Sequence, residues 1–299
     1  MAIASNTNFP LQHLTVAAYR FGRPDPTTII DGSTLWRATL TPLGPATVKI
    51  EGIGTTPFAE FFGPGADWLK ARYDALLGDD DVIPDLVAHH DVVKRAQKRF
   101  QHLALGRTET PYHEIIPAVL GQRVTAGEAV RQWQALVTQF GERAPGPHPT
   151  LRVPPTPDVL ARLGYVTFHE YGIERKRADT IRNIARVSHF LIRDWPSNVP
   201  AEQHTHSLMN LPGVGPWTAA VAGSVAFGDP DALAVGDFHL KNTVAWALHG
   251  IARGTDEQML ESLAPYVGHR HRVVRWLQLM GYRAPARGPR RPIVSITQL

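Results

Sequence analysis

The chain has 299 residues, of which 43% are hydrophobic and 19% charged, so it is globular and not disordered or fibrous. A formal charge of +4 and a sequence pI near 9.5 make it basic without making it a polycation, which suits an acidic partner but does not establish one. The absence of cysteine excludes disulfides, thiol nucleophiles, iron–sulfur clusters and thiolate zinc sites.

The beginning of the chain carries no targeting pattern. It lacks the basic and apolar regions of a signal peptide, and no apolar run approaches the ~20 residues that span a bilayer. We therefore expect a cytoplasmic protein with no membrane partner.

An antiparallel hairpin is predicted early in the chain. Thr34–Thr41 alternates between polar and apolar residues, and Ala46–Glu51 does the same with its apolar side chains on one side. The intervening Pro42–Pro45 has turn composition. One face of this hairpin should be buried.

Two helical patterns follow, over residues 66–77 and 92–103. Together with the hairpin they predict an N-terminal lobe over residues 1–108 that mixes antiparallel sheet and helix. Residues 1–9 are polar and expected to be loose.

The remainder, residues 109–299, is predicted to be a helical core, so the fold class is α+β and mostly helical. Thr125 and Glu128 form a capping-box pattern at the start of one helix, which Gly141 ends. The proline-rich stretch 144–157 reads as an extended linker.

The C-terminal part of the chain repeats the capping signal. Thr255 and Gln258 form a second capping box, which opens the helices expected over 255–281. The tail beyond Tyr282 is rich in Arg, Pro and Gly and should be irregular.

The stretch 211–219, Leu-Pro-Gly-Val-Gly-Pro-Trp-Thr-Ala, carries the strongest functional signal. Glycines two apart let backbone amides approach an anion without a Cβ in the way, and Pro216 suits the first position of the next helix. The helix N-terminus adds a favourable dipole for phosphate. Taken alone, the pattern is more often that of an ordinary helix–turn–helix corner.

The surrounding motifs extend this signal. The 211–219 motif followed by Val235-Gly-Asp-Phe-His-Leu-Lys241 resembles the helix-hairpin-helix plus Gly/Pro/Asp (HhH-GPD) signature of a DNA glycosylase superfamily. Residues 115–125 and the helix start at 175–178 are similar to its AlkA-like branch, the DNA-3-methyladenine glycosylase II enzymes. The resemblance covers most of residues 110–245 and implies a helical glycosylase core.

The resemblance places the catalytic carboxylate at Asp237. Cleavage of an N-glycosidic bond builds positive charge on the deoxyribose, and a fixed carboxylate stabilises that charge and can orient or deprotonate water. The alternative role for Asp237 is as a helix N-cap, and the two roles are compatible.

The resemblance also implies a base pocket. Trp217 stands where strand-cleaving members carry a Schiff-base lysine, so no lyase activity is expected, and its ring suits stacking on an electron-poor base. Val221 replaces an expected tyrosine, and Trp276 is the candidate for the opposite wall. Trp36 and Tyr19 are candidates for the N-terminal pocket aromatic.

DNA contacts follow from the same resemblance. Gln122 and Arg123 map to the minor-groove wedge that fills the space of an extruded nucleotide. A structural monovalent cation, Na⁺ or K⁺, is implied at the Leu211 and Val214 carbonyls, and no other cofactor is expected. The implied contacts to the DNA backbone are Gly213, Val214, Gly215, Thr218, His239 and Lys241. The expected phosphate-facing fringe is Arg175, Lys176, Arg177, Arg270, Arg272 and Arg275.

These features predict a monomeric, monofunctional base-excision-repair DNA glycosylase acting on double-stranded DNA. It would flip a damaged base, an alkylated purine such as 3-methyladenine or 7-methylguanine, and hydrolyse its glycosidic bond to leave an abasic site. Two alternatives remain open: a glycosylase for a different or bulkier modified base, and a non-catalytic protein that binds damaged DNA.

Overall fold

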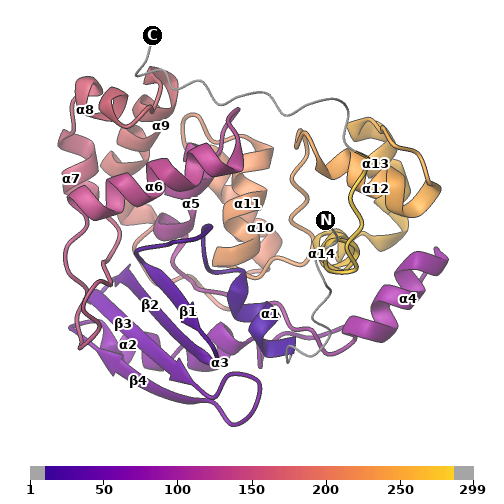
Figure 1. Ribbon diagram of the computed structural model, residues 1–299, viewed down its shortest axis with the longest axis horizontal. Helices are drawn as coiled ribbons and strands as arrows, with labels where there is room; N and C mark the ends of the chain where they lie inside the picture. The colour runs from indigo at the N-terminus through magenta and orange to yellow at the C-terminus, as the bar shows by residue number, and fades with distance from the viewer. Residues whose placement is uncertain (1–10, 286–299) are drawn as a thin grey trace.

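The protein, described by a computed structural model over residues 11–285, combines one antiparallel sheet with many helices (Figure 1). The α+β prediction is therefore confirmed. The loose start at residues 1–9 and most of the predicted irregular tail lie outside the described residues.

The sheet has four strands in the order β1-β2-β3-β4, and each neighbouring pair is antiparallel. The predicted hairpin is confirmed as β2 and β3, with Leu35 opposite Ile50. Its inward side chains Ala46, Val48 and Ile50 are fully buried. The sequence analysis missed the two edge strands, which are short and at most partly buried over most of their length. The strands are β1 (Thr28–Asp31), β2 (Thr34–Thr41), β3 (Gly44–Glu51) and β4 (Phe58–Phe62).

The helices occupy the rest of the chain, and the predicted helix over 66–77 is divided into two short ones. In chain order they are α1 (Leu11–Ala17), α2 (Ala66–Lys70), α3 (Tyr73–Leu77), α4 (Asp91–Phe100), α5 (Pro111–Leu120), α6 (Ala126–Phe140), α7 (Pro157–Arg162), α8 (Tyr165–Glu170), α9 (Arg175–Arg186), α10 (Ala201–Ser207), α11 (Pro216–Ala226), α12 (Leu240–His249), α13 (Asp256–Leu263) and α14 (Arg270–Leu279).

Capping explains several of the helix boundaries. Thr125 caps α6 by accepting the amide of Glu128, and Gly141 follows its last residue. The full reciprocal capping box is present at α13, between Thr255 and Gln258. At α6 the Glu128 carboxylate accepts Gln132 instead, so only half of the predicted box forms.

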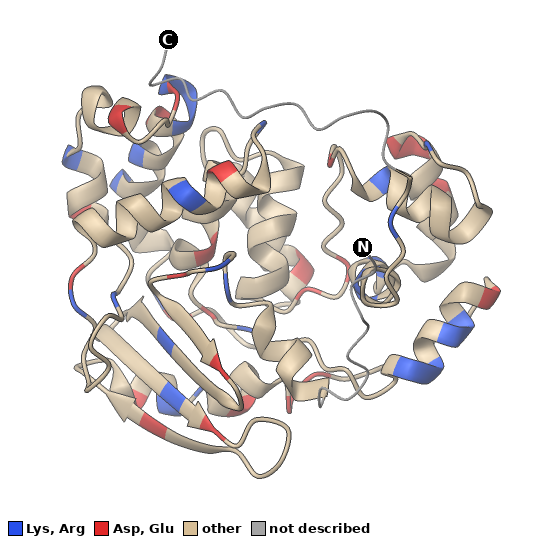
Figure 2. Cartoon of the chain, in the orientation of Figure 1, with Lys and Arg blue, Asp and Glu red and all other residues tan. Residues whose placement is uncertain are grey.

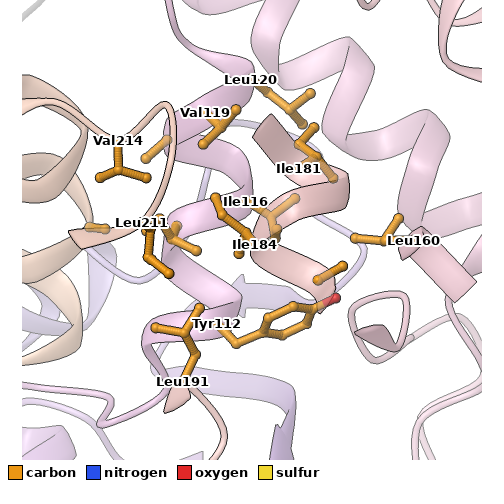
Figure 3. Packing of buried hydrophobic residues seen from close by; sticks show 14 of the residues in the cluster. Tyr112, Ile116, Val119, Leu120, Leu160, Ile181, Ile184, Leu191, Leu211 and Val214 are labelled. Carbon is orange, nitrogen blue, oxygen red and sulfur yellow. The ribbon is translucent and has the colours of Figure 1, made fainter. Parts of the chain in front are cut away.

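The central hydrophobic cluster joins α5 to α7, α9 and α11 (Figure 3). Ile116 and Leu120 of α5 lie against Ile181 and Ile184 of α9 in this view. Leu211 and Val214, on either side of the Pro-Gly pair, point into the same cluster and are 8% and 6% exposed. This packing fixes the hairpin to the helical core.

A second cluster joins α12, α13 and α14 to α4. Val93 and Phe100 of α4 pack with Val273 and Leu277 of α14, so α4 belongs to the C-terminal helices and not to the sheet lobe. The predicted boundary at residue 108 therefore does not match the division of the hydrophobic clusters. Long-range packing puts α4 with the C-terminal helices, and local sequence patterns do not show such packing.

The linker 144–157 is irregular, with one isolated bridge between Arg143 and Arg152, and α7 begins at its last residue. Among residues 11–285, no helix has the length and apolar character required to cross a bilayer.

Candidate active site

The hairpin between α10 and α11 needs glycine at residue 213, the first of its two glycines. Gly213 has φ +86°, in the left-handed region, and a Cβ there would lie closer than 3.0 Å to Oγ1 of Thr180 on α9. The Val214 amide donates to the Leu211 carbonyl at 3.0 Å, which closes the turn. Gly213 is thus required by both backbone conformation and packing.

Gly215 is different. Its φ is −97°, which any residue can adopt, and a Cβ there would meet no atom within 4 Å. It precedes α11, whose Trp217 and Thr218 amides lie in the first turn and have no intrahelical acceptor. The missing side chain therefore leaves an open approach to the positive end of the helix dipole.

Asp237 is held by three hydrogen bonds. Its Oδ1 accepts the amides of His239 and Leu240, both at 2.8 Å, at the start of α12. Its Oδ2 accepts the indole Nε1–H of Trp217 at 3.0 Å. The residue therefore caps the start of α12 and also contacts Trp217 of α11. This geometry is compatible with the catalytic role, which stays a prediction.

The Asp237 loop is fixed from α13. Asp256 accepts the Gly236 amide at 3.1 Å on Oδ1 and the Lys241 ammonium at 2.9 Å on Oδ2. The hydrogen bond from Lys241, with a smaller contribution from the Gly236 amide, holds the pKa of Asp256 below its ordinary value. Lys241, expected at the DNA backbone, is instead paired within the protein.

The α5–α6 loop lies against the hairpin. Gln122 Nε2 donates to the Gly213 carbonyl at 3.0 Å and to Thr218 Oγ1 at 2.9 Å. A Cβ on Gly121 would stand 3.1 Å from the ring of Trp217, so glycine makes room for the indole. The expected wedge and the expected pocket tryptophan are therefore neighbours.

Arg123 is the exposed tip of this loop, with φ +59°. Within the described chain its guanidinium has no hydrogen bond and no ion pair. The side chain is thus available to an external partner.

Several predicted pocket residues lie elsewhere. Trp276 is 1% exposed inside the α4–α14 cluster, so it cannot form a wall of an open pocket in this structure. Tyr19 is buried and donates to the Leu76 carbonyl, and Trp36 stacks on Phe62 of the sheet. Val221 is half-buried on α11 and packs on the central cluster.

Two of the predicted DNA contacts, Thr218 and His239, differ in how far their side chains are exposed. The Thr218 hydroxyl is buried and accepts from Gln122, so only its amide could face DNA. His239 is exposed next to Phe238, itself 75% exposed, and its imidazole is open to a partner.

The predicted arginine fringe is smaller than expected. Most of its members serve the interior: Arg177 donates to the Leu120 carbonyl, Arg270 pairs with Asp231, Arg272 with Asp81, and Arg275 donates to the Leu14 carbonyl. Arg175 and Lys176, in the first turn of α9, remain exposed. Basic residues recur along this helix (Figure 2). With Gly213 the two exposed residues line a hollow of about 470 Å³, which Asp179 also lines, 3.8 Å from Arg175. The two basic side chains outnumber this carboxylate beside the hairpin.

The carbonyls at the hairpin suit a monovalent cation in their chemistry, because they are neutral oxygen ligands. The Leu211 carbonyl also accepts the Val214 amide, and the Gly213 carbonyl accepts Gln122. Residues 11–285 contain no group of three or more His, Asp or Glu side chains arranged for a metal. The cation at Leu211 and Val214 stays a prediction.

Sequence reasoning missed two residues of this site, Gly121 and Asp256. Asp256 directly follows the Thr255 cap, so its local signal is that of an acidic residue favoured by a helix dipole. Only the three-dimensional fold brings it to Gly236.

No protein-family model matches the chain. A stretch of 110 residues is 29% identical to DNA-3-methyladenine glycosylase 2 of Escherichia coli (strain K12) and covers 36% of this chain and 38% of that protein. A stretch of 131 residues is 28% identical to thymine/uracil-DNA glycosylase of Methanothermobacter thermautotrophicus and covers 44% of this chain and 52% of that protein. The matches thus span no more than about half of these curated relatives.

Similar solved structures cover more of the chain. The 3-methyladenine DNA-glycosylase of Archaeoglobus fulgidus has a TM-score of 0.69 at 16% identity, with 90% of this chain and 94% of that chain covered. The 8-oxoguanine glycosylase/lyase of Clostridium acetobutylicum, in complex with double-stranded DNA, has a TM-score of 0.60 at 10% identity, with 85% and 87% covered. At these identities the likeness shows the fold. Together, the sequence and structural similarities point to the HhH-GPD DNA glycosylase superfamily, which includes the 3-methyladenine glycosylase II proteins.

Proposed function

We propose that the protein is a monofunctional DNA glycosylase that removes a damaged base from double-stranded DNA. The observation that carries this proposal is the hydrogen bond between the Trp217 indole and the Asp237 carboxylate. This bond joins a flat aromatic side chain to a carboxylate held in position. Both lie at the N-terminus of α11, where the first-turn amides have no intrahelical acceptor.

The chemistry assigned to Asp237 follows from its fixed position. Departure of a base leaves positive charge on the deoxyribose, and a carboxylate that is already oriented stabilises that charge without reorganising. The two backbone amides and the indole set the direction of the carboxylate. Its remaining lone pairs can orient or deprotonate the attacking water.

The grip on DNA is assigned to the hairpin. The amides at the start of α11 and the side chains of Arg175 and Lys176 suit phosphate oxygens, and Gly215 leaves the path to those amides open. Contacts of this kind position the duplex without reading its sequence.

Base flipping is assigned to the loop at Gln122 and Arg123. Extruding a nucleotide costs a few kcal/mol of lost pairing and stacking, so a side chain that occupies the vacated space helps to hold the duplex open. Gln122 is anchored to the hairpin, and Arg123 projects beyond it. A guanidinium there can stack on or hydrogen-bond to the orphan base.

The proposed substrate is an alkylated purine such as 3-methyladenine or 7-methylguanine. A cationic, electron-poor base would stack favourably on Trp217, and two of the similar proteins are named for 3-methyladenine. A different or bulkier base is the second candidate, favoured by the small Val221 side chain and by the relatives named for thymine/uracil and 8-oxoguanine. Trp217, which is not an amine nucleophile, supports hydrolysis over lyase chemistry.

A non-catalytic damage binder is disfavoured by the three donors that hold Asp237. A carboxylate next to DNA phosphates repels them, and an uncharged Ser, Thr or Asn could cap α12 without that repulsion.

The proposal is tested by incubating the protein with duplexes that each carry one defined modified base, followed by heat and alkali to reveal abasic sites. Asp237→Asn keeps the size of the side chain but removes its charge, and we expect a loss of at least 10²-fold in single-turnover rate. Full activity of this variant would refute the mechanism. Strand scission before alkali would refute the monofunctional assignment, and binding without base release on every duplex would favour the damage binder.

A further inference from the structure

A second concave site lies away from the hairpin, the wedge loop and the Asp237 loop. It is a groove of about 790 Å³ formed by the segment between α1 and β1, the end of α6 and the proline-rich linker. Four arginines line it: Arg20, Arg23, Arg143 and Arg152. We call it the arginine groove.

The charges in this groove are unbalanced. Of the residues that line it, only Asp25 is acidic. Asp25 is 3% exposed, and its oxygens already accept the Phe21 and Thr27 amides, the Thr27 hydroxyl and the Trp133 indole. It therefore has little capacity left to bind a guanidinium directly.

Three of the arginines make no direct polar contact within the described residues, although Asp25 attracts Arg20 through space. Within residues 11–285, the guanidiniums of Arg20, Arg23 and Arg143 form no ion pair and no hydrogen bond. Arg152 uses one nitrogen to donate to the Gly141 carbonyl, which orients it and leaves its other N–H groups available. Burial is the main cause that lowers the pKa of Arg20; the like charge of Arg23 lowers it further, and the charge of Asp25 opposes both.

Arg20 is half-buried, whereas Arg23 and Arg143 are exposed. Of the other buried or half-buried arginines, Arg275 donates to the Leu14 carbonyl, and several bind carboxylates. A set of guanidiniums facing a concave surface without such partners is the arrangement that recognises phosphate, because the planar fork matches phosphate oxygens.

The remaining lining suggests an organic body on the ligand. Apolar side chains of Pro24, Ile29 and Pro149 share the groove with the arginines. A volume of about 790 Å³ falls in the range of small-molecule sites and exceeds what a single inorganic anion needs. A nucleotide combines several negative charges with a flat body that can pack on proline and aliphatic surfaces.

We propose that the arginine groove binds the phosphate groups of a nucleotide, either free or at the end of a nucleic-acid strand. The site is separate from the candidate active site, so it does not depend on the glycosylase assignment. Binding there would replace mutual repulsion of guanidiniums by charge-assisted hydrogen bonds.

The test is calorimetric titration of the full-length protein with two probes, ATP and a short 5′-phosphorylated single-stranded oligonucleotide. We expect at least one probe to bind, with an affinity that falls as salt is raised. Binding of ATP would identify a free nucleotide as the source, and binding of the oligonucleotide alone would identify a strand end. Arg20→Gln and Arg143→Gln should each raise Kd roughly tenfold or more.

The matched control is Arg162→Gln, which removes the same charge from an exposed residue outside the groove and should leave Kd unchanged. The midpoint temperature of thermal unfolding should not be lower for unliganded Arg20→Gln than for the wild type, since the variant relieves repulsion. An unchanged midpoint together with a higher Kd would show that the variant has lost binding and not folding.

Two outcomes would overturn the proposal: neither probe binds at about 1 mM, or the arginine variants bind like the wild type. In the first case, binding of a polyglutamate peptide would make the groove a site for an acidic peptide.

Discussion

The two hairpin glycines allow a direct test of which glycine serves the fold and which serves a ligand. We expect Gly213→Ala to destabilise the protein and Gly215→Ala to leave stability intact while weakening DNA binding. Gly213 has φ +86°, and a Cβ there would clash with Thr180. Gly215 has φ −97°, and a Cβ there would meet open space.

The magnitudes follow from these surroundings. Alanine in the left-handed region costs roughly 1–2 kcal/mol, and forcing a methyl group into a packed contact costs roughly 1–3 kcal/mol more. The Thr180 hydroxyl donates to the Lys176 carbonyl at 3.0 Å, so it cannot turn away without losing that bond. Gly213→Ala should therefore lower the free energy of unfolding by about 2–5 kcal/mol.

Gly215→Ala should change the free energy of unfolding by less than about 1 kcal/mol, and a small gain is expected because alanine restricts the unfolded chain. On the proposed DNA complex, its methyl group would stand between the α11 amides and a phosphate. Loss of one hydrogen bond to a charged group is worth roughly 1.5–3 kcal/mol, or about tenfold or more in Kd.

The assays are urea denaturation for stability and fluorescence anisotropy with a labelled duplex for binding. Adding Thr180→Ala to Gly213→Ala removes Oγ1 and Cγ2, so part of the loss should be recovered, and Thr180→Ala alone provides the reference for this double-mutant cycle. Equal DNA affinity of Gly215→Ala and wild type would refute the assignment of the hairpin as a phosphate site. Unchanged stability of Gly213→Ala would refute the packing argument.

Three further predictions concern the indole, the loop anchor and a buried histidine. Trp217→Phe keeps an aromatic face but removes the donor to Asp237, so the single-turnover rate should fall about tenfold or more while affinity for abasic-site DNA is kept; an unchanged rate would contradict a positioning role for the indole. Because Lys241 is paired with Asp256, Lys241→Met should leave the salt dependence of DNA binding unchanged. A plot of log K against log salt that becomes shallower by about 0.9 would instead reveal a direct phosphate contact. Burial, with the charge of Arg37, lowers the pKa of His113 well below its ordinary 6.5, so the folded state binds this proton less readily than the unfolded chain. Its contribution to stability is thus complete above pH 6.5 and falls by ~1.4 kcal/mol for each pH unit below it. Urea denaturation between about pH 6.5 and 5.5 should show that the free energy of unfolding depends less steeply on pH in His113→Asn than in the wild type. The control is His102→Asn, which changes an exposed histidine and should keep the wild-type dependence.

The basis of the His113 prediction is a buried network. Arg37 can only donate, so its contact of 3.1 Å to Nδ1 makes that nitrogen an acceptor and leaves Nε2–H to donate to Thr27. Protonation of Nδ1 would set two donors against each other beside a permanent positive charge.

Local sequence patterns were enough to predict the β2–β3 hairpin, the caps at Thr125 and Thr255, and the turn at Gly213. Each of these depends on residues within a few positions of one another, where alternation, capping and backbone conformation act. Asp237 was also recognisable, because the motif around it is contiguous, although its role in catalysis stays a prediction.

The tertiary structure decided which charged and aromatic side chains remain available. Arg272 looked like a phosphate contact but pairs with Asp81, 191 positions away, and Trp276 is enclosed by helices from both ends of the chain. Burial and ion pairing depend on distant partners, so a basic or aromatic residue carries no local sign of them. For the same reason the anchor at Asp256 and the unpaired guanidiniums of the arginine groove emerged only once the chain was folded.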